Sequence, residues 1–251
     1  MQARTAPHRE TQADLLLTVI AVIAAFVPIT GLLLAPLGIV SLAQWFVWAA
    51  LPATIVLALV AVYGLAANQV LFNRIVAGFL ASFIASLGLD AVRLTWVALG
   101  VMPGIPVAVG SMAAGLPMMG PPPFGVLPWA SGLPFGVIAL GFFYHLVLNS
   151  GFWGSGYALA LGRTPVWTGI IWGLLLELIT MVSSPFLMMG FTPFGFNFGP
   201  RPFVVTLIAH IVYGVIFGVL RLRWVFDEAW SEGIRAVWPG LQSEEEKRRA
   251  V

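Results

Sequence analysis

The chain has 251 residues, of which 60% are hydrophobic and only 9% are charged, and its formal net charge is +2. So few charges exclude a water-soluble fold of this length, because a soluble surface needs ionic groups to stay dispersed. The small positive charge, without a basic cluster, excludes a nucleic-acid-binding protein. The absence of cysteine excludes disulfides, thiolate metal sites and cysteine nucleophiles.

Long apolar stretches recur along the chain and predict its fold class. One helical crossing of the roughly 30 Å hydrocarbon layer needs about 20 apolar residues. We therefore predict an all-α polytopic transmembrane bundle of about six spans, with 1–67 as an N-terminal pair of helices. Asp14 lies in a capped helix start, and Pro28 is a kink site within the first span. The expected spans are 14–34, 44–67, 75–101, 135–161, 166–189 and 202–220.

Positive charge predicts the orientation of these spans. With six spans, all but one of the arginines near the helix ends fall on one side of the membrane, and only Arg201 falls on the other. Cytoplasmic loops carry such an excess of positive charge, so we expect both termini in the cytoplasm. The arginines on the expected cytoplasmic side are Arg4, Arg9, Arg74, Arg163, Arg221 and Arg223.

The tail 224–251 has the pattern of an amphipathic helix. Its apolar residues recur at roughly helical spacing, opposite the charged residues of the same segment. This pattern is typical of a helix lying in the headgroup region, and docking on a partner's cytoplasmic face is the alternative. The apolar positions are Trp224, Phe226, Trp230, Ile234, Val237 and Trp238.

An internal similarity predicts that part of the chain is duplicated. The octapeptide MMGPPPFG at 118–125 returns as MMGFTPFG at 188–195, with six of eight positions identical. An apolar helix with one acid precedes each copy, and a helix with one histidine follows it. We predict that 73–222 consists of two parallel repeats, 73–161 and 163–222. The corresponding residues are Asp90 with Glu177, and His145 with His210.

Five ionisable side chains are expected inside the spans at a shared level. At 1.5 Å per helical residue, Asp90 lies roughly 24 Å above Arg74, and Glu177 lies roughly 21 Å above Arg163. An ion is costly in hydrocarbon, so such groups face the bundle interior and find partners there. This set, the buried polar layer, consists of Asp90, Arg93, His145, Glu177 and His210.

The buried polar layer has one structural interpretation and several functional ones. Structurally, Asp90 pairs locally with Arg93, Glu177 accepts from Arg93 or a histidine, and the network fixes which helices pack together. Functionally, Asp90, His145, Glu177 and His210 are a ligand set for zinc, iron or manganese, although Arg93 would repel a cation. Alternatively, Arg93 and a histidine hold a quinone or a lipid headgroup, or the acids and histidines form a proton or solute pathway.

A haem is a further alternative, with His145 and His210 as axial ligands of its iron. Small residues near the two histidines are expected to leave space for the macrocycle. These residues are Gly141, Gly151, Gly154, Gly214 and Gly218.

The outer loop 102–134 contains no charged residue and is rich in proline, glycine and methionine. Irregular backbone cannot face lipid at depth, because its amides would go unpaired. We therefore expect this loop to fold back into the membrane or, more simply, to be covered by other membrane subunits. Two G-x-x-x-G patterns, 169–173 and 214–218, predict that spans five and six touch each other or another subunit.

No complete catalytic motif occurs in the chain, so we do not expect an enzyme. The leading prediction is an accessory or structural subunit of a larger membrane complex of redox, respiratory or photosynthetic type. The alternatives are a haem-, metal- or quinone-binding membrane protein that uses His145 and His210, and a small proton-coupled transporter.

Four short motifs within 73–220 carry a resemblance to a known family. They are Asp90-x-x-Arg93, Tyr144-His145-x-x-x-Asn149, Trp172-Gly173-x-x-x-Glu177 and His210-x-x-Tyr213-Gly214. In these motifs the chain resembles the functionally uncharacterised bacterial inner-membrane proteins of the YagU-like kind. The resemblance implies a location in the bacterial cytoplasmic membrane and no particular activity, and the first two spans lie outside it.

Overall fold

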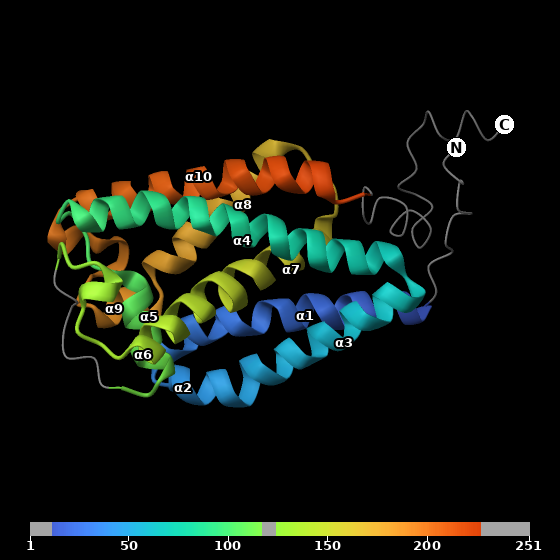
Figure 1. Ribbon diagram of the computed structural model, residues 1–251, viewed down its shortest axis with the longest axis horizontal. Helices are drawn as coiled ribbons and strands as arrows, with labels where there is room; N and C mark the ends of the chain where they lie inside the picture. Colours follow the sequence, from blue (N-terminus) through green and yellow to red (C-terminus); the bar gives the residue numbers. More distant parts are fainter. Residues whose placement is uncertain (1–11, 117–123, 227–251) are drawn as a thin grey trace.

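The computed structural model describes residues 12–116 and 124–226, and every regular element in these residues is helical. Six helical rods run along the long axis of the molecule (Figure 1), and each is long and apolar enough to cross a membrane. The predicted fold class is therefore confirmed. The rods are Gln12–Leu37, Leu42–Ala67, Gln69–Ala98, Phe135–Leu161, Val166–Met188 and Arg201–Trp224.

Two of the six spans are single unbroken α-helices, and two contain a π-helical segment. The third span is α4 (Gln69–Ala98) and the sixth is α10 (Arg201–Trp224). The others are α1 (Gln12–Leu34) with the 3-10 turn η1 (Ala35–Leu37); α2 (Leu42–Trp45), the π-helix η2 (Phe46–Ala50) and α3 (Leu51–Ala67); α6 (Phe135–Phe142), the π-helix η4 (Phe143–Gly151) and α7 (Phe152–Leu161); and α8 (Val166–Met181) with α9 (Ser184–Met188).

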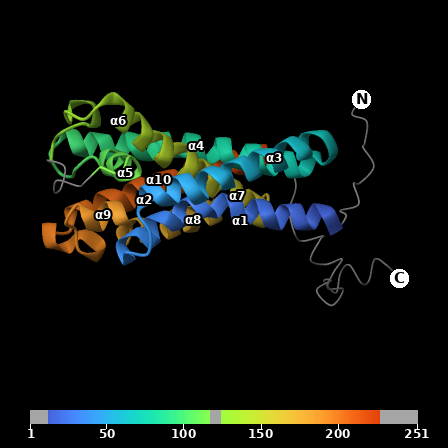
Figure 2. The ribbon, with the colours of Figure 1, turned by 90° about the horizontal axis from the view of Figure 1, so that it is seen from below.

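The spans alternate in direction, so the bundle has two distinct ends. The start of α1, the end of α10 and the α3–α4 turn gather at one end, called the inner end below, while α5 (Ile105–Ala113), α6 and α9 gather at the outer end (Figure 2). Two short 3-10 turns also belong to the outer end, η3 (Pro128–Ala130) and η5 (Pro193–Phe198).

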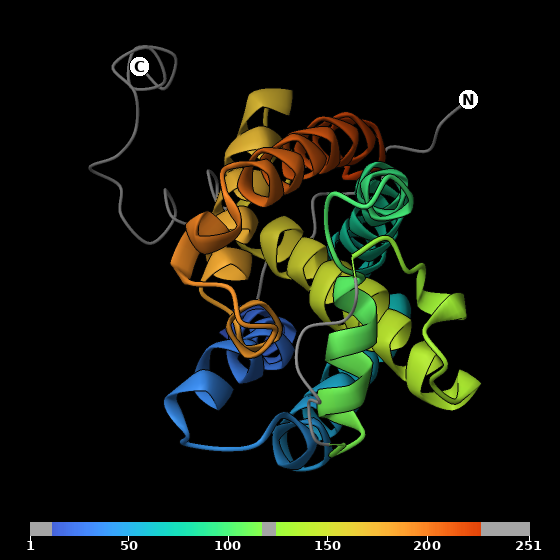
Figure 3. The same ribbon diagram turned by 90° about the vertical axis from the view of Figure 1, so that its left-hand side faces the viewer.

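The outer loop is covered in part by its own chain. Every residue of α5 is buried, and α5 lies among the ends of the spans when the outer end is viewed directly (Figure 3). The backbones of α5 and α6 touch, since a Cβ added to Gly141 would lie 2.0 Å from the carbonyl oxygen of Pro106. On α9, the Ser184 hydroxyl donates a 2.7 Å hydrogen bond to the carbonyl of Leu32. The segment 105–113 therefore needs no partner to bury its apolar side chains.

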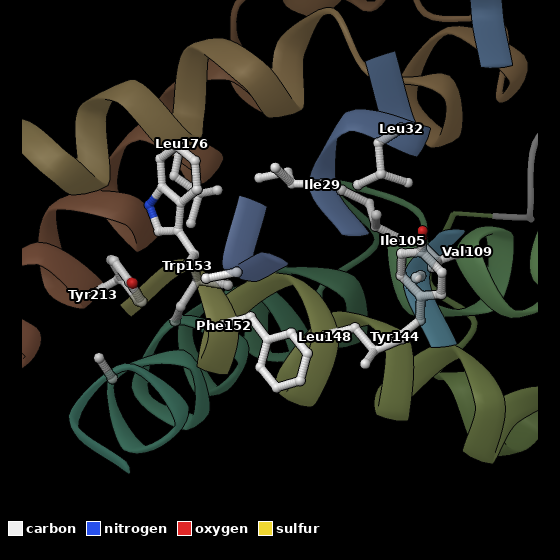
Figure 4. Close-up of a cluster of buried hydrophobic side chains, with 14 of the residues drawn as sticks. Ile29, Leu32, Ile105, Val109, Tyr144, Leu148, Phe152, Trp153, Leu176 and Tyr213 are labelled. Atoms are coloured by element: carbon white, nitrogen blue, oxygen red, sulfur yellow. The ribbon is translucent and has the colours of Figure 1, made fainter. Parts of the chain in front are cut away.

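Side chains from α1, α5, α8, α10 and the fourth span form a continuous apolar core (Figure 4). Tyr144 projects from η4 towards α1 and donates a hydrogen bond to the carbonyl of Pro28 at 2.9 Å. Trp45 donates to the neighbouring carbonyl of Val27 at 2.8 Å. Neighbouring helices thus bond to two carbonyls of α1 beside its proline, those of Val27 and Pro28.

Spans five and six touch along the predicted glycine faces. A Cβ on Gly173 would lie 2.4 Å from the carbonyl oxygen of His210, and one on Gly214 would lie 2.6 Å from the Cα of Ile170. The prediction that these spans pack on each other is confirmed. Because glycine lets the two backbones approach this closely, the contact brings Glu177 of α8 beside α10.

The outward-facing surface is apolar and the charged groups lie inside. Leu16, Ile23, Ile55, Leu59 and Val62 are all more than half exposed, whereas Asp90, Arg93, Glu177 and His210 are buried. This distribution suits a bundle surrounded by lipid. The predicted interfacial helix 224–251 lies outside the described residues, except that Trp224 is the last residue of α10 and Val225 and Phe226 follow it.

Candidate functional site

The first acid of the buried polar layer is paired with the first histidine. Asp90 lies on α4 and His145 on η4, and the Asp90 Oδ1 lies 3.0 Å from the His145 Nε2. His145 is part of a nine-residue π-helix, which the sequence did not predict. A π-helix has wider turns than an α-helix and often marks a functional site. A height for His145 counted along an ideal α-helix is therefore inaccurate, and the contact itself places His145 level with Asp90.

The second acid is paired with the second histidine in the same way. Glu177 of α8 places its Oε2 2.7 Å from the Nδ1 of His210 on α10. The hydroxyl of Thr206, one turn earlier on α10, donates to the Glu177 Oε1 at 2.8 Å. The His210 Nδ1 also lies 2.8 Å from the carbonyl oxygen of Thr206, and the Glu177 Oε2 has no well-aligned hydrogen bond. Thr206 is a member of this site that sequence reasoning missed.

Arg93 is the one member of the buried polar layer without a partner among the described residues. It is 4% exposed, forms no hydrogen bond or ion pair with them, and its Nη2 is buried and unbonded. The predicted local pair with Asp90 is not formed, because Asp90 bonds to His145 instead. The predicted bond from Arg93 to Glu177 is not formed either, because Glu177 accepts from Thr206. Arg93 nevertheless lies within electrostatic range of both carboxylates.

Several other buried polar atoms in this region also lack a partner. Ser86 precedes Asp90 and Arg93 by four and seven residues, which places the three on one helical face. Asn149 and Trp153 follow His145 by four and eight residues. Buried polar groups in proteins are bonded in the great majority of cases, so this concentration of unbonded atoms marks the polar layer as unusual. The unbonded atoms are Ser86 Oγ, Asp90 Oδ2, Arg93 Nη2, Asn149 Oδ1, Trp153 Nε1, Trp172 Nε1 and Glu177 Oε2.

The four-residue metal site predicted from sequence is not formed. In the described residues, no three His, Asp or Glu side chains lie close enough together to hold a metal ion. Each carboxylate faces its own histidine, so the acids and histidines form two separate pairs. Asp90, His145, Glu177 and His210 therefore do not converge on one point.

The space expected for a haem macrocycle is also not provided by the glycines. All five of them pack against protein atoms rather than facing a void. Gly151 meets the ring of Phe79, Gly154 meets Ser82, and Gly218 meets the carbonyl of Val166. Gly141 and Gly214 lie against backbone of α5 and α8. These glycines bring helices together, so they supply no pocket between His145 and His210.

A separate groove of about 450 Å³ lies at the inner end, between α3, α4 and the end of α10. Its lining is mostly apolar, with Leu65, Phe72 and Val76 among the residues, and Arg223 at one side. None of the residues of the buried polar layer lines it, and its lining, among the described residues, contains no acid and no histidine. We therefore place the candidate site at the polar layer, where the acids and histidines lie.

Comparison with known proteins gave no match: no family model, curated protein or solved structure matches the chain. The resemblance to YagU-like proteins thus stays a prediction. The functional argument therefore depends on the geometry of the polar layer.

Proposed function

We propose that the chain is a small proton-coupled membrane transporter whose buried polar layer carries the protons. The observation that supports this best is the pairing of each buried acid with a histidine, Asp90 with His145 and Glu177 with His210. Histidine exchanges its proton near neutral pH, and chains of acids and histidines inside membranes form proton relays.

The two pairs are electrostatically connected. Asp90 interacts with Arg93 and His210 as well as with His145, and Arg93 interacts with Glu177. A change of protonation in one pair therefore alters the field at the other. Four helices contribute to this set, so a proton taken up at the layer can favour one arrangement of the helices over another.

A purely structural network explains the layer less well. Buried polar networks stabilise a fold when every member is bonded, and a partly bonded network is destabilising. Here Arg93 Nη2, Asp90 Oδ2 and Ser86 Oγ are buried without partners. Such a cost is typical of a working site and is unexpected in a scaffold.

The accessory-subunit hypothesis receives less support, because its main reason was an uncharged outer loop in need of cover. The chain itself covers α5 within that loop. A partner that contacts the rest of 102–134 remains a prediction.

We also propose that the protein resides in the bacterial cytoplasmic membrane with both termini inside. The arginines at the inner end support this orientation, since Arg74, Arg163, Arg221 and Arg223 lie there and Arg201 starts α10 at the outer end. The duplication is part of the same proposal. It is supported by an acid–histidine pair in each unit and by a positive φ at the corresponding Gly125 and Gly195.

Proton flux in liposomes tests the proposed function. The full chain is reconstituted with a pH-sensitive dye inside, and an inward proton gradient is applied with and without a membrane potential. We expect flux above that of empty liposomes, and Glu177→Gln or Asp90→Asn should abolish it because each removes the acid of one pair. Carbodiimide, which reacts with protonated carboxyl groups, should label Asp90 and Glu177 in the wild-type chain.

Asp14→Asn is the matched control. Asp14 is a buried acid too, but it lies at the inner end and accepts a 3.0 Å hydrogen bond from Asn68. This variant should keep its flux. Flux that survives both Glu177→Gln and Asp90→Asn, or no flux and no labelling at all, contradicts the proposed function.

A further inference from the structure

We infer that Arg93 is the anchor for a carboxylate group of a small ligand bound inside the membrane. The inference deepens the proposed function by naming the chemical class of the solute. It rests on that function only for the claim that the ligand is transported, since binding can be measured separately.

Arg93 lacks the counter-ion that a buried guanidinium needs. Removing a cation from water without a paired anion is strongly unfavourable, and arginine does not lose its proton in proteins. Arg93 is only 4% exposed, and it forms no ion pair within 4.0 Å among the described residues. An anion at this position would give the guanidinium a directly bonded partner.

The nearby acids are held away from Arg93 by other groups. Asp90 lies only three residues earlier on α4, yet its Oδ1 bonds to His145. Glu177 is held by Thr206 and lies against His210. The two histidines therefore keep both carboxylates from closing onto the guanidinium, and this leaves the donors of Arg93 for an incoming group.

The chemistry of the donor favours a carboxylate over a cation or a neutral solute. The planar fork of a guanidinium matches the two oxygens of a carboxylate, and this bidentate pair is short and strong. A cation would be repelled by Arg93. A neutral carbonyl would accept hydrogen bonds at one oxygen only and would not match both arms of the guanidinium fork.

Charge balance links binding of the anion to uptake of protons. With both histidines neutral, two negative carboxylates and one positive guanidinium give the layer a net charge of −1. A bound monocarboxylate makes this −2, and protonation of His145 and His210 restores neutrality. Among the described residues, the charges that act on Arg93 are Asp90 on its own helix and Glu177 on α8, and the titratable partners of these acids are His145 on η4 and His210 on α10.

Two tyrosines near this level are already engaged. The Tyr144 hydroxyl donates to Pro28, and the Tyr213 hydroxyl lies 2.6 Å from the Ser82 hydroxyl. The protons taken up with the anion are therefore assigned to the acid–histidine pairs. By linkage, uptake of protons with the anion makes the affinity fall as the pH rises.

Benzoate is the probe, and benzamide, which has the same shape without the charge, is its matched control. Binding to the full chain in lipid nanodiscs is measured by calorimetry at pH 6 and pH 8, in two buffers of different ionisation enthalpy so that protons are counted. We expect benzoate to bind more tightly at pH 6 with net proton uptake, and benzamide not to bind. Arg93→Met should weaken benzoate roughly tenfold to a hundredfold, and Arg93→Lys should keep part of the affinity.

Several results would overturn the inference. They are equal binding of benzoate and benzamide, no benzoate binding at millimolar concentration, or unchanged benzoate affinity in Arg93→Met. Failure of the proposed function is distinguishable, since benzoate binding without proton flux refutes transport and leaves the anchor in place. Proton flux in the wild-type chain without any benzoate binding refutes the anchor alone.

Discussion

Three arginines are buried among the described residues, Arg74, Arg93 and Arg221, and the surroundings of Arg93 and Arg221 are opposite. Arg221, near the end of α10, donates to the carbonyls of Gly162, Thr164 and Pro165 and to the hydroxyls of Thr164 and Thr168. Its guanidinium also lies 4.6 Å from the ring centre of Tyr157. Arg93, on α4, forms no such bond within the described residues.

The difference separates an arginine that stabilises the fold, Arg221, from one assigned to a binding site, Arg93. Arg221 bonds the carbonyls of Gly162, Thr164 and Pro165 at the α7–α8 turn, and that of Pro165 also accepts the Thr168 N–H at 3.2 Å. It thereby joins α7, α8 and α10. Arg93 forms no hydrogen bond with the described residues and meets the charges of Asp90 and Glu177 only at longer range, so a ligand, water or a changed arrangement would lower the cost of its burial. The contacts of Arg221 therefore stabilise the inner end, whereas the polar layer is the proposed functional site.

The largest expected effect on stability is the loss of the hydrogen bonds of Arg221. Arg221→Gln should lower the free energy of unfolding by about 3 kcal/mol, because it breaks a buried charged network and leaves several carbonyls unbonded. Reversible unfolding in mixed micelles measures this loss. Arg223→Gln is the control, since Arg223 is exposed two residues later and its change should stay within about 0.5 kcal/mol. An equal loss of unfolding free energy in both variants would contradict the stabilising role of Arg221.

A smaller effect is expected where the second acid is held. Thr206→Val keeps the shape of the side chain but removes the hydroxyl that donates to Glu177. Buried hydrogen bonds between membrane helices contribute about 0.6–2 kcal/mol, so we expect a loss of about 1 kcal/mol and an altered pH profile of proton flux.

Thr180→Val is its matched control. The Thr180 hydroxyl bonds only to the carbonyl of Leu176 on its own helix. This variant should leave the pH profile of flux unchanged. A shifted pH profile in Thr180→Val, or an unshifted pH profile in Thr206→Val, would contradict the assigned role of Thr206.

Sequence alone was sufficient for the spans and for the residues of the polar layer. Runs of apolar residues determine the spans, since length and hydrophobicity suffice to cross a bilayer. Ionisable residues inside such runs are easily recognised, because nearly all their neighbours are apolar. The glycine face between α8 and α10 was also predictable from its spacing.

The pairing within the layer was not predictable from the sequence. Asp90 and Arg93 are neighbours on one helical face, which favours a local ion pair, but tertiary packing places His145 closer to Asp90. The π-helix that carries His145 has no sequence signal in this chain, and Thr206 reads as an ordinary polar residue of a membrane helix. The spacing of Ser86, Asp90 and Arg93 could have pointed to a longer polar face.

The stability of Arg93→Met tests the central claim most directly. If Arg93 supports no internal contact, replacing it with an apolar side chain of similar length removes an unpaired buried charge. The free energy of unfolding without ligand should then equal that of the wild type or exceed it by up to about 2 kcal/mol. A loss of stability comparable to that of Arg221→Gln would show that Arg93 is a structural anchor and would contradict the account.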